Sequence, residues 1–260
     1  MRIIVCIKQV PETTAVRINP ETNTVIREGV KSIINPFDMF AVEEGIRLKE
    51  RCGGTTVALT MGPPQAESAL RETLAMGIDE AVLISDRAFA GSDTWATSYT
   101  LSCAIRKINQ YDLILCGRQA SDGDTAQVGP GISAHLDIPQ VTYVRKIVDI
   151  NNGHATVERM TEDGYEVLEV PLPALLTVVR EINTPRLPSL KGMLRAKHAP
   201  ITRWTAQDLQ ADPALIGLSG SPTIVTRIFT PTPPAGGQRL EGDLHEVVSK
   251  LVEALRNEVP

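Results

Sequence analysis

The stretch Asp112–Gly131, DLILCGRQASDGDTAQVGPG, decides the fold. It begins with a short apolar run that is typical of a buried strand, and a glycine-containing loop and a helix start follow. A loop between a strand and a helix is a place where backbone N–H groups and the helix dipole can hold a phosphate or pyrophosphate. However, Asp122 and Asp124 place two negative charges in this loop. The sequence therefore raises the question of what lies against it.

The same order of strand and helix extends toward the N-terminus. The strand-like runs are residues 2–7, 55–62 and 80–85, and the helical patterns between them are residues 38–53, 63–77 and 92–108. This alternation predicts an α/β fold with a Rossmann-like, doubly wound parallel sheet. Ligands of such sheets bind beyond the carboxyl ends of the strands. The loop after Cys116 is one such end, and the loop Thr60–Pro64, TMGPP, is another.

After Pro139 the alternation ends. Apolar and polar residues alternate on both sides of Asn152-Gly153, a strong hairpin signal, so we expect an added antiparallel hairpin. From Asn183 prolines interrupt the chain until a terminal helical pattern at 243–259. We therefore expect a nucleotide-binding α/β domain over residues 1–183 and an extended C-terminal arm over residues 184–260. The many apolar side chains of the arm favour packing on a partner over disorder.

Composition excludes several classes of function. The 260 residues carry a formal net charge of -5, so there is no basic field to attract nucleic acid or an anionic membrane. The four cysteines form no C-x-x-C pair and the four histidines have no metal-ligand spacing, so no metal site is expected. No stretch reaches membrane-spanning length, and the N-terminal apolar run is too short for a signal peptide. We expect a cytoplasmic protein with reduced thiols.

Two loops each allow a functional and an ordinary interpretation. Asp124 and Gln127 have the spacing of a capping box, or else the helix begins near Pro130 and residues 122–129 are all loop. Asn35–Asp38, NPFD, is a loop that closes over an adenosine or an ordinary helix start with proline in its first turn. The sequence alone favours the ordinary helix start for NPFD and does not decide the first case.

A third loop, Phe89–Ser98, resembles another helix start with small residues. Four of its side chains could contact a phosphate or ribose, although helix capping is the simpler interpretation: Ser92, Asp93, Thr94 and Thr97. The sequence contains no G-x-S-x-G, H-E-x-x-H or Walker A motif, so no catalytic constellation of side chains emerges. These features favour a nucleotide-binding protein whose chemistry belongs to a cofactor.

Taken together, these segments resemble the beta subunit of electron-transfer flavoproteins along essentially the whole chain. The strongest match is Val157–Ile201, VERMTEDGYEVLEVPLPALLTVVREINTPRLPSLKGMLRAKHAPI. The earlier segments VCIKQVPET, NPFD, LTMGPP, ETLAMGIDEA and GRQASDGDTAQVGP match in the same order. One departure is His198, which stands where many members of the family have a lysine.

The resemblance implies a heterodimer with an alpha subunit that carries an FAD, and a nucleotide buried in the Rossmann-like domain of this chain. It also implies that the arm after Pro185 contains a recognition loop, with Leu190 as the apolar anchor for a pocket on a flavin dehydrogenase. The family's nucleotide contacts carry over to Cys6, Asn35, Pro36, Phe37, Asp38, Met61, Gly117, Arg118, Gln119, Ala120, Asp122, Gly123, Asp124, Thr125, Ala126, Gln127, Val128 and Gly129.

The segment Thr125–Pro130, TAQVGP, resembles the version found in flavin-bifurcating members. The resemblance therefore implies an FAD in this chain, in place of the AMP of ordinary members. That FAD would accept a hydride from NADH, pass one electron to ferredoxin or flavodoxin, and pass the other through the alpha-subunit FAD to a dehydrogenase. Ser92, Asp93, Thr94 and Thr97 are then candidates for the NADH site.

Three alternatives remain open. The first is an ordinary AMP-binding beta subunit that carries electrons along a single path. The second is a stress-type nucleotide-binding module, which the long arm and its signature disfavour. The third is a nucleotide hydrolase or ATP pyrophosphatase, which would need a glycine-rich loop after the first strand, whereas IKQVPETTA contains no glycine.

Overall fold

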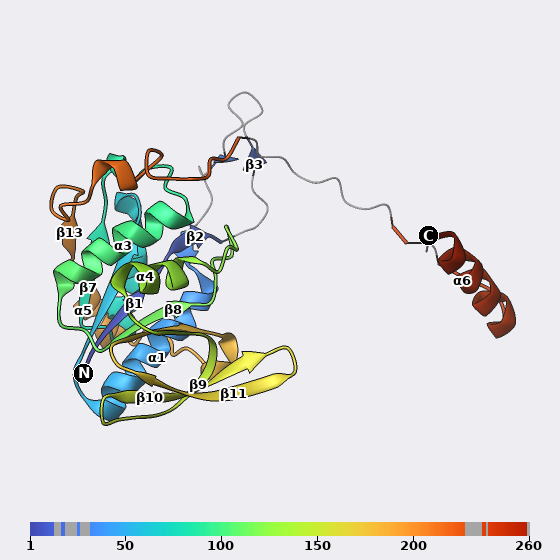
Figure 1. The fold of residues 1–260 in the computed structure, drawn as a ribbon, viewed down its shortest axis with the longest axis horizontal. Coiled ribbons are helices and arrows are strands. Elements are labelled where there is room, and N and C mark those ends of the chain that lie inside the picture. Colours follow the sequence, from blue (N-terminus) through green and yellow to red (C-terminus); the bar gives the residue numbers. More distant parts are fainter. Residues whose placement is uncertain (13–16, 19–24, 27–31, 227–235, 238, 259–260) are drawn as a thin grey trace. The chain divides into compact units, whose positions relative to one another are not determined.

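The structure, a computed structural model, describes residues 1–260 except 13–16, 19–24, 27–31, 227–235, 238 and 259–260. The chain divides into two units, Met1–Thr226 and Arg227–Pro260 (Figure 1). The first unit contains the central sheet and helices α1 to α5, and the second contains helix α6. No helix in the described ranges combines the length and the apolar character needed to cross a membrane.

A mainly parallel sheet runs through the first unit. Within the described residues it has nine strands in the order β11-β10-β9-β12-β8-β1-β6-β7-β13. All neighbouring pairs from β9 to β13 in this order are parallel, whereas β10 is antiparallel to both β9 and β11. The strands are β1 (Arg2–Cys6), β6 (Thr55–Met61), β7 (Glu80–Ile84), β8 (Leu113–Gly117), β9 (Gln140–Asn151), β10 (His154–Thr161), β11 (Gly164–Pro171), β12 (Ala174–Val178) and β13 (Thr202–Trp204).

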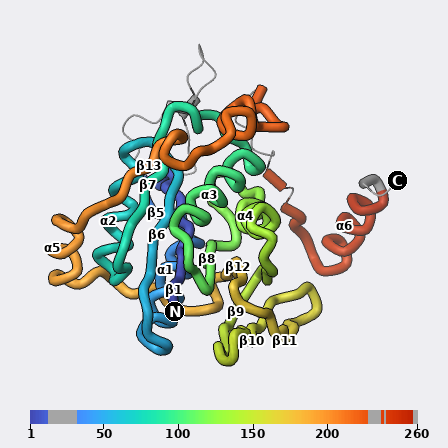
Figure 2. The backbone as a smooth tube through the Cα atoms, turned by 60° about the vertical axis from the view of Figure 1, so that its left-hand side comes forward, coloured from blue at the N-terminus to red at the C-terminus, as the bar shows by residue number. Residues whose placement is uncertain are grey.

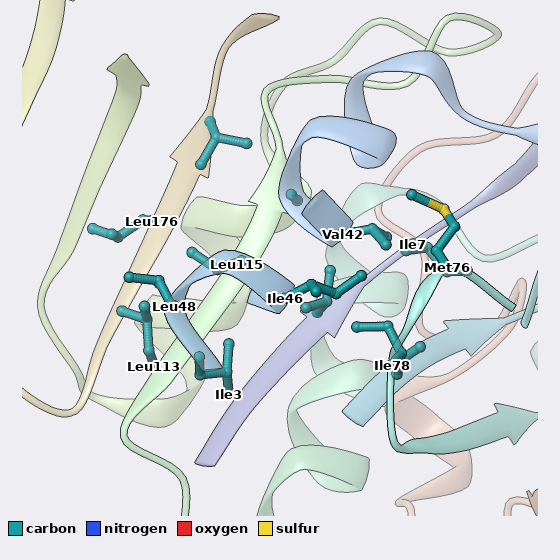
Figure 3. Packing of buried hydrophobic residues seen from close by; sticks show 14 of the residues in the cluster. Ile3, Ile7, Val42, Ile46, Leu48, Met76, Ile78, Leu113, Leu115 and Leu176 are labelled. Atoms are coloured by element: carbon teal, nitrogen blue, oxygen red, sulfur yellow. The ribbon is translucent and has the colours of Figure 1, made fainter. Parts of the chain in front are cut away.

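Helices cover both faces of the sheet, because the side chains of the central strands alternate between two apolar clusters. In β1, Ile3 and Val5 join the cluster that contains residues of α1 and α2, whereas Ile4 and Cys6 join the cluster that contains residues of α3 and α4. Figure 3 shows Ile46 of α1 among the residues of the first cluster. The helices are α1 (Pro36–Cys52), α2 (Glu67–Met76), α3 (Thr94–Ile108), α4 (Val128–Leu136), α5 (Leu190–His198) and α6 (Leu244–Glu258).

This arrangement confirms the predicted Rossmann-like sheet and the added hairpin. The hairpin turn lies at Asn152-Gly153, where both residues have positive φ, 46° and 77°. Strand β11 then adds a third antiparallel strand. The remaining short elements are β2 (Gln9–Pro11), β3 (Arg17–Ile18), β4 (Val25–Ile26), β5 (Ser32–Ile34), and the 3₁₀ turns η1 (Pro64–Ala66), η2 (Arg87–Phe89), η3 (Arg180–Ile182) and η4 (Pro213–Leu215).

Residues 184–226 pack on the body of the same chain, which the sequence did not predict. Strand β13 pairs with β7 and extends the parallel sheet, and α5 lies beside α2 (Figure 2). Ala196, Leu209 and Ile216 are buried. The proline-interrupted pattern hid these contacts because each depends on a distant element. The predicted boundary between residues 183 and 184 separates the nucleotide-binding domain from the arm by their expected roles, and it stays a prediction.

Candidate nucleotide-binding site

The candidate site lies where the strand order reverses. The chain runs from β1 outward to β6 and β7, and then returns to the other side of β1 to form β8. The loops that follow β1 and β8 therefore diverge at the carboxyl ends of these two strands. Such a place, where the strand order reverses, is called a switch point, and open α/β sheets bind ligands there. Cys6 and Cys116 are direct partners in the register of these two strands, and both are buried.

The NPFD segment at the start of α1 forms hydrogen bonds to both of the diverging loops. The Asn35 side chain donates to the carbonyl oxygen of Gln119 (2.7 Å) and accepts from the backbone N–H of Ser121 (3.1 Å). Asp38 Oδ2 accepts from the backbone N–H of Lys8 (2.7 Å). Both side chains therefore position the loops that surround the switch point. Ser121 is absent from the residues inferred by resemblance, although its place in the same loop could have indicated it.

Gly117 is required by the close approach of α1 to the end of β8. A Cβ added there would collide with Asp38 Oδ1 and would lie 2.6 Å from the carbonyl carbon of Phe37. The next residue, Arg118, lies over the rings of Phe37 and Tyr143, 5.2 and 5.4 Å from the two ring centroids. The start of the loop is thus held on both sides, and we expect it to keep its shape when a ligand binds.

Two buried groups beneath the loops have raised pKa values. Burial raises the pKa of Asp38 from 3.8 to about 7, against the opposing effect of hydrogen bonds from Asn35 and from the backbone of Lys8 and Gly117. The hydrogen bond to Cys6, together with burial, raises the pKa of the Cys116 thiol. Near neutral pH, Cys116 is therefore protonated and Asp38 is close to its midpoint.

Asp38→Asn is expected to change how stability depends on pH. The folded-state pKa of Asp38 lies above that of the unfolded chain, so its contribution to stability is complete below the unfolded pKa and is lost as pH rises through about 7. The free energy of unfolding of the wild type, minus that of Asp38→Asn, should fall by on the order of 4 kcal/mol across that window. Denaturant unfolding at low protein concentration, followed by tryptophan fluorescence, measures it.

Glu50→Gln provides the matched control. The hydrogen bond from Arg186 is the main cause that lowers the pKa of Glu50, so this carboxylate contributes stability at high pH and loses it as pH falls. The free energy of unfolding of the wild type, minus that of Glu50→Gln, should therefore rise with pH. The change should be small, because Glu50 is exposed. Parallel pH profiles for the wild type and Asp38→Asn would show that Asp38 titrates at an ordinary pKa.

The negative charge of Asp122 has a partner that the resemblance did not name. The ammonium group of Lys8, in the loop after β1, lies 2.6 Å from Asp122 Oδ1. Both side chains are partly exposed, so the pair is accessible to solvent. Lys8 is the first residue of IKQVPETTA that could meet an anion at the switch point. Its position just beyond a strand at the carboxyl edge was the signal available in the sequence.

Helix α4 begins without a side-chain cap. It starts at Val128, and its N-cap residue, Gln127, makes no capping hydrogen bond from its side chain. The capping box of Asp124 and Gln127 therefore does not form, and the helix starts two residues before Pro130. Pro130 lies in the first turn, where its missing N–H needs no partner. The N–H groups at the start of α4 are consequently available to an anion, where the helix dipole favours negative charge.

The structure joins one of the candidate NADH residues, Thr94, to the same loop. Thr94 Oγ1 donates to Thr125 Oγ1 over 3.3 Å. Asp93 caps α3 by accepting from the backbone of Trp95 and Ala96, and it also accepts from Thr223. Ser92 Oγ accepts from the backbone N–H of Gly217. The side chains of Ser92 and Asp93 therefore hold the segment 217–223, and a role for Ser92, Asp93, Thr94 and Thr97 toward NADH stays a prediction.

The remaining predicted residues fall into two places. Cys6, Met61 and the stretch from Gly117 to Gly129 lie at or after the carboxyl ends of β1, β6 and β8, as a nucleotide site requires. Leu190 begins α5 and is exposed. Among the described residues, no group of three or more His, Cys, Asp or Glu side chains could hold a metal ion. That these residues contact a nucleotide stays a prediction.

A switch point with an uncapped helix N-terminus and a nearby lysine is typical of the nucleotide-binding α/β class of proteins. Comparison with known families is more specific, because the electron transfer flavoprotein domain matches residues 22–209. The chain belongs to the electron transfer flavoprotein family, and the resemblance to beta subunits is confirmed by its relatives.

Three relatives illustrate this similarity. The chain is 55% identical to the electron transfer flavoprotein subunit beta of Thermoanaerobacterium thermosaccharolyticum, over 99% of this chain and 98% of the relative. It is 53% identical to the caffeyl-CoA reductase-Etf complex subunit CarD of Acetobacterium woodii, over 98% of each chain. It is 49% identical to protein FixA of Azotobacter vinelandii, over 90% of this chain and 85% of the relative.

Proposed function

We propose that this chain is the beta subunit of a flavin-bifurcating electron-transfer flavoprotein and that it holds an FAD at the switch point between β1 and β8. The observation that carries the proposal is a pair of features beside one loop that can each bind an anion: the Lys8 ammonium, which pairs with Asp122, and the uncapped N-terminus of α4. Two separate anion-binding features suit the two phosphates of FAD better than the single phosphate of AMP. The similarity to the CarD subunit of a reductase-Etf complex supports the same choice.

In this proposal the protein positions the loops of the site and binds the diphosphate of the cofactor. Asn35 and Asp38 hold the two loops, Gly117 allows α1 to approach β8, and Lys8 and the start of α4 bind the diphosphate. Bound FAD would supply hydride acceptance from NADH and one-electron transfer, to ferredoxin or flavodoxin and, through the alpha-subunit FAD, to a flavin dehydrogenase. The cysteines, all free thiols, suit the cytoplasmic location that we infer.

The decisive measurement is the nucleotide content of the heterodimer reconstituted with an alpha subunit. We expect two FAD per heterodimer after acid extraction and chromatography, with NADH able to reduce both. One FAD and one AMP per heterodimer would make the chain an ordinary single-path beta subunit. Extraction of an FAD with no reduction by NADH would keep the nucleotide assignment and reject bifurcation from NADH.

We also propose that α5 and the residues just before it dock a flavin dehydrogenase. Three leucines there expose large fractions of their side chains: 89% for Leu187, 77% for Leu190 and 69% for Leu194. An exposed apolar cluster on a folded chain is typical of a protein interface, and one anchor residue can contribute much of the binding energy. Leu190 is the expected anchor.

A further inference from the structure

Helix α5 is held on α2 by two arginines that reach in opposite directions. Arg195 of α5 donates to the carbonyl oxygens of Leu74 (2.6 Å) and Ile78 (3.0 Å), at and beyond the end of α2. Arg71 of α2 donates to the carbonyl oxygen of Ala196 (2.7 Å), with longer contacts to the next carbonyl groups at the end of α5. Each helix thus supplies the guanidinium that satisfies the C-terminal carbonyl groups of the other.

These contacts suit the chemistry of helix ends. The last carbonyl groups of a helix lack partners within the helix and carry the negative end of its dipole. A guanidinium has several donors in a fixed planar arrangement and can serve two carbonyl oxygens at once. Arg71 is itself fixed by Glu67, which accepts from its Nε (2.9 Å) and Nη2 (2.6 Å) and also pairs with Arg203 of β13. We call Arg71 and Arg195 the arginine latch.

The backbones of the two helices are also in close contact. A Cβ added at Gly192 would collide with the carbonyl oxygen of Ala75 in the last turn of α2. Ser189 caps the other end of α5 by accepting from the backbone N–H of Gly192 (3.0 Å). The Ser189 cap therefore orders the first turn of α5, while the Gly192 contact and the arginine latch fix the helix on α2.

Apolar packing alone does not explain this position. Ala196 is the buried residue of α5, whereas Leu190, Met193 and Leu194 are exposed. A nine-residue helix is too short to be stable in isolation, so its order depends on tertiary contacts. Since the larger apolar side chains point to solvent, the hydrogen bonds of the arginine latch contribute a large share of those contacts.

We propose that the arginine latch preorganises α5 for docking, so that Arg71 and Arg195 are positioning residues for electron transfer to the dehydrogenase. This inference rests on the proposed docking role of Leu190. A helix that is already ordered spares the partner the entropic cost of ordering it upon binding. The latch should therefore determine the concentration of dehydrogenase needed for transfer, and the flavins of the heterodimer should be unaffected.

The test uses the complete heterodimer and, as the electron acceptor, caffeyl-CoA reductase from Acetobacterium woodii, whose Etf subunit CarD is 53% identical to this chain. We expect Arg195→Met to raise the KM for the reductase by about 10-fold, with kcat and flavin spectra unchanged. Amide hydrogen exchange in residues 190–198 should become faster. Arg195→Lys should recover most of the affinity, because an ammonium can still donate to a carbonyl at the end of α2.

Lys146→Met is the matched control, because it removes a positive charge from an exposed position on β9, outside the proposed docking surface. It should leave the KM unchanged, which separates the latch from a general effect of charge. Arg71→Met should raise the KM as Arg195→Met does. The KM of the double variant should be about the same as that of either single variant, because the two arginines act as one unit. If Arg195→Met does not fold, Arg71→Lys, which keeps the charge beside Glu67, should still raise the KM by a few-fold.

The outcomes distinguish this inference from the docking proposal. If Leu190→Ala raises the KM and Arg195→Met does not, docking stands and the latch plays no part in it. If Leu190→Ala leaves the KM unchanged, or the wild type shows no saturable transfer to the reductase, the docking proposal itself is wrong. Equal changes for Lys146→Met and Arg195→Met would also overturn the latch.

Discussion

Lys8→Met is expected to weaken binding of FAD to the nucleotide-free heterodimer by about 10- to 100-fold, the range for loss of one charge-assisted hydrogen bond. The Lys8 ammonium lies beside the loop that follows β8 and pairs with Asp122 at 2.6 Å. A bound diphosphate competes with Asp122 for this ammonium and also binds at the start of α4. Isothermal titration of FAD measures the change.

Asp122→Asn is the matched control for this prediction. It frees the ammonium from its carboxylate partner, so FAD should bind as tightly as in the wild type or a few-fold more tightly, most clearly at low salt. The loss caused by Lys8→Met should be smaller for AMP, which has a single phosphate. If Lys8→Met binds FAD normally while Asp122→Asn disturbs the loop, the pair has only a structural role and the diphosphate assignment loses its main support.

The parts of the fold that follow from local patterns could be predicted from the sequence. The alternation of apolar runs and helical patterns from residue 2 to residue 136 identifies the doubly wound sheet, because each element is specified by its own periodicity. Asn152-Gly153 identifies the hairpin, because few residue pairs adopt two consecutive positive φ angles easily. The position of the site at the carboxyl edge of the sheet could also be predicted, because the loops that follow parallel strands all lie at that edge.

The details of the site depend on contacts between distant residues, which no local pattern reveals. The Lys8–Asp122 pair joins residues 114 positions apart, and the hydrogen bonds of Asn35 to Gln119 and Ser121 span 84 and 86 positions. The spacing of Asp124 and Gln127 matched a capping box, but the chain turns through positive φ at Asp124 and Ala126 and the helix begins later. Tertiary contacts therefore decided between the two interpretations of this loop.

Disrupting the apolar stripe of α6 is expected to weaken association with the alpha subunit by on the order of 100-fold or more. Five side chains on α6 lie at helical spacing and are exposed: Leu244, Val248, Leu251, Val252 and Leu255. Each contributes roughly 1.5–3 kcal/mol when fully buried, so a partner that covers several of them gains a large part of its binding energy there. Leu251→Asp places a charge in the middle of the stripe, and analytical ultracentrifugation measures the dissociation constant.

Ser249→Asp adds the same charge to an exposed position outside the stripe and should leave association nearly unchanged. The capping hydrogen bond from the backbone of Glu246 to Asp243 (3.0 Å) lies at the start of α6, so neither variant removes it. Without an alpha subunit the wild-type chain should aggregate at high concentration, because exposed apolar stripes self-associate, and coexpression should prevent this. If Leu251→Asp assembled as tightly as Ser249→Asp, the stripe would not contact the alpha subunit.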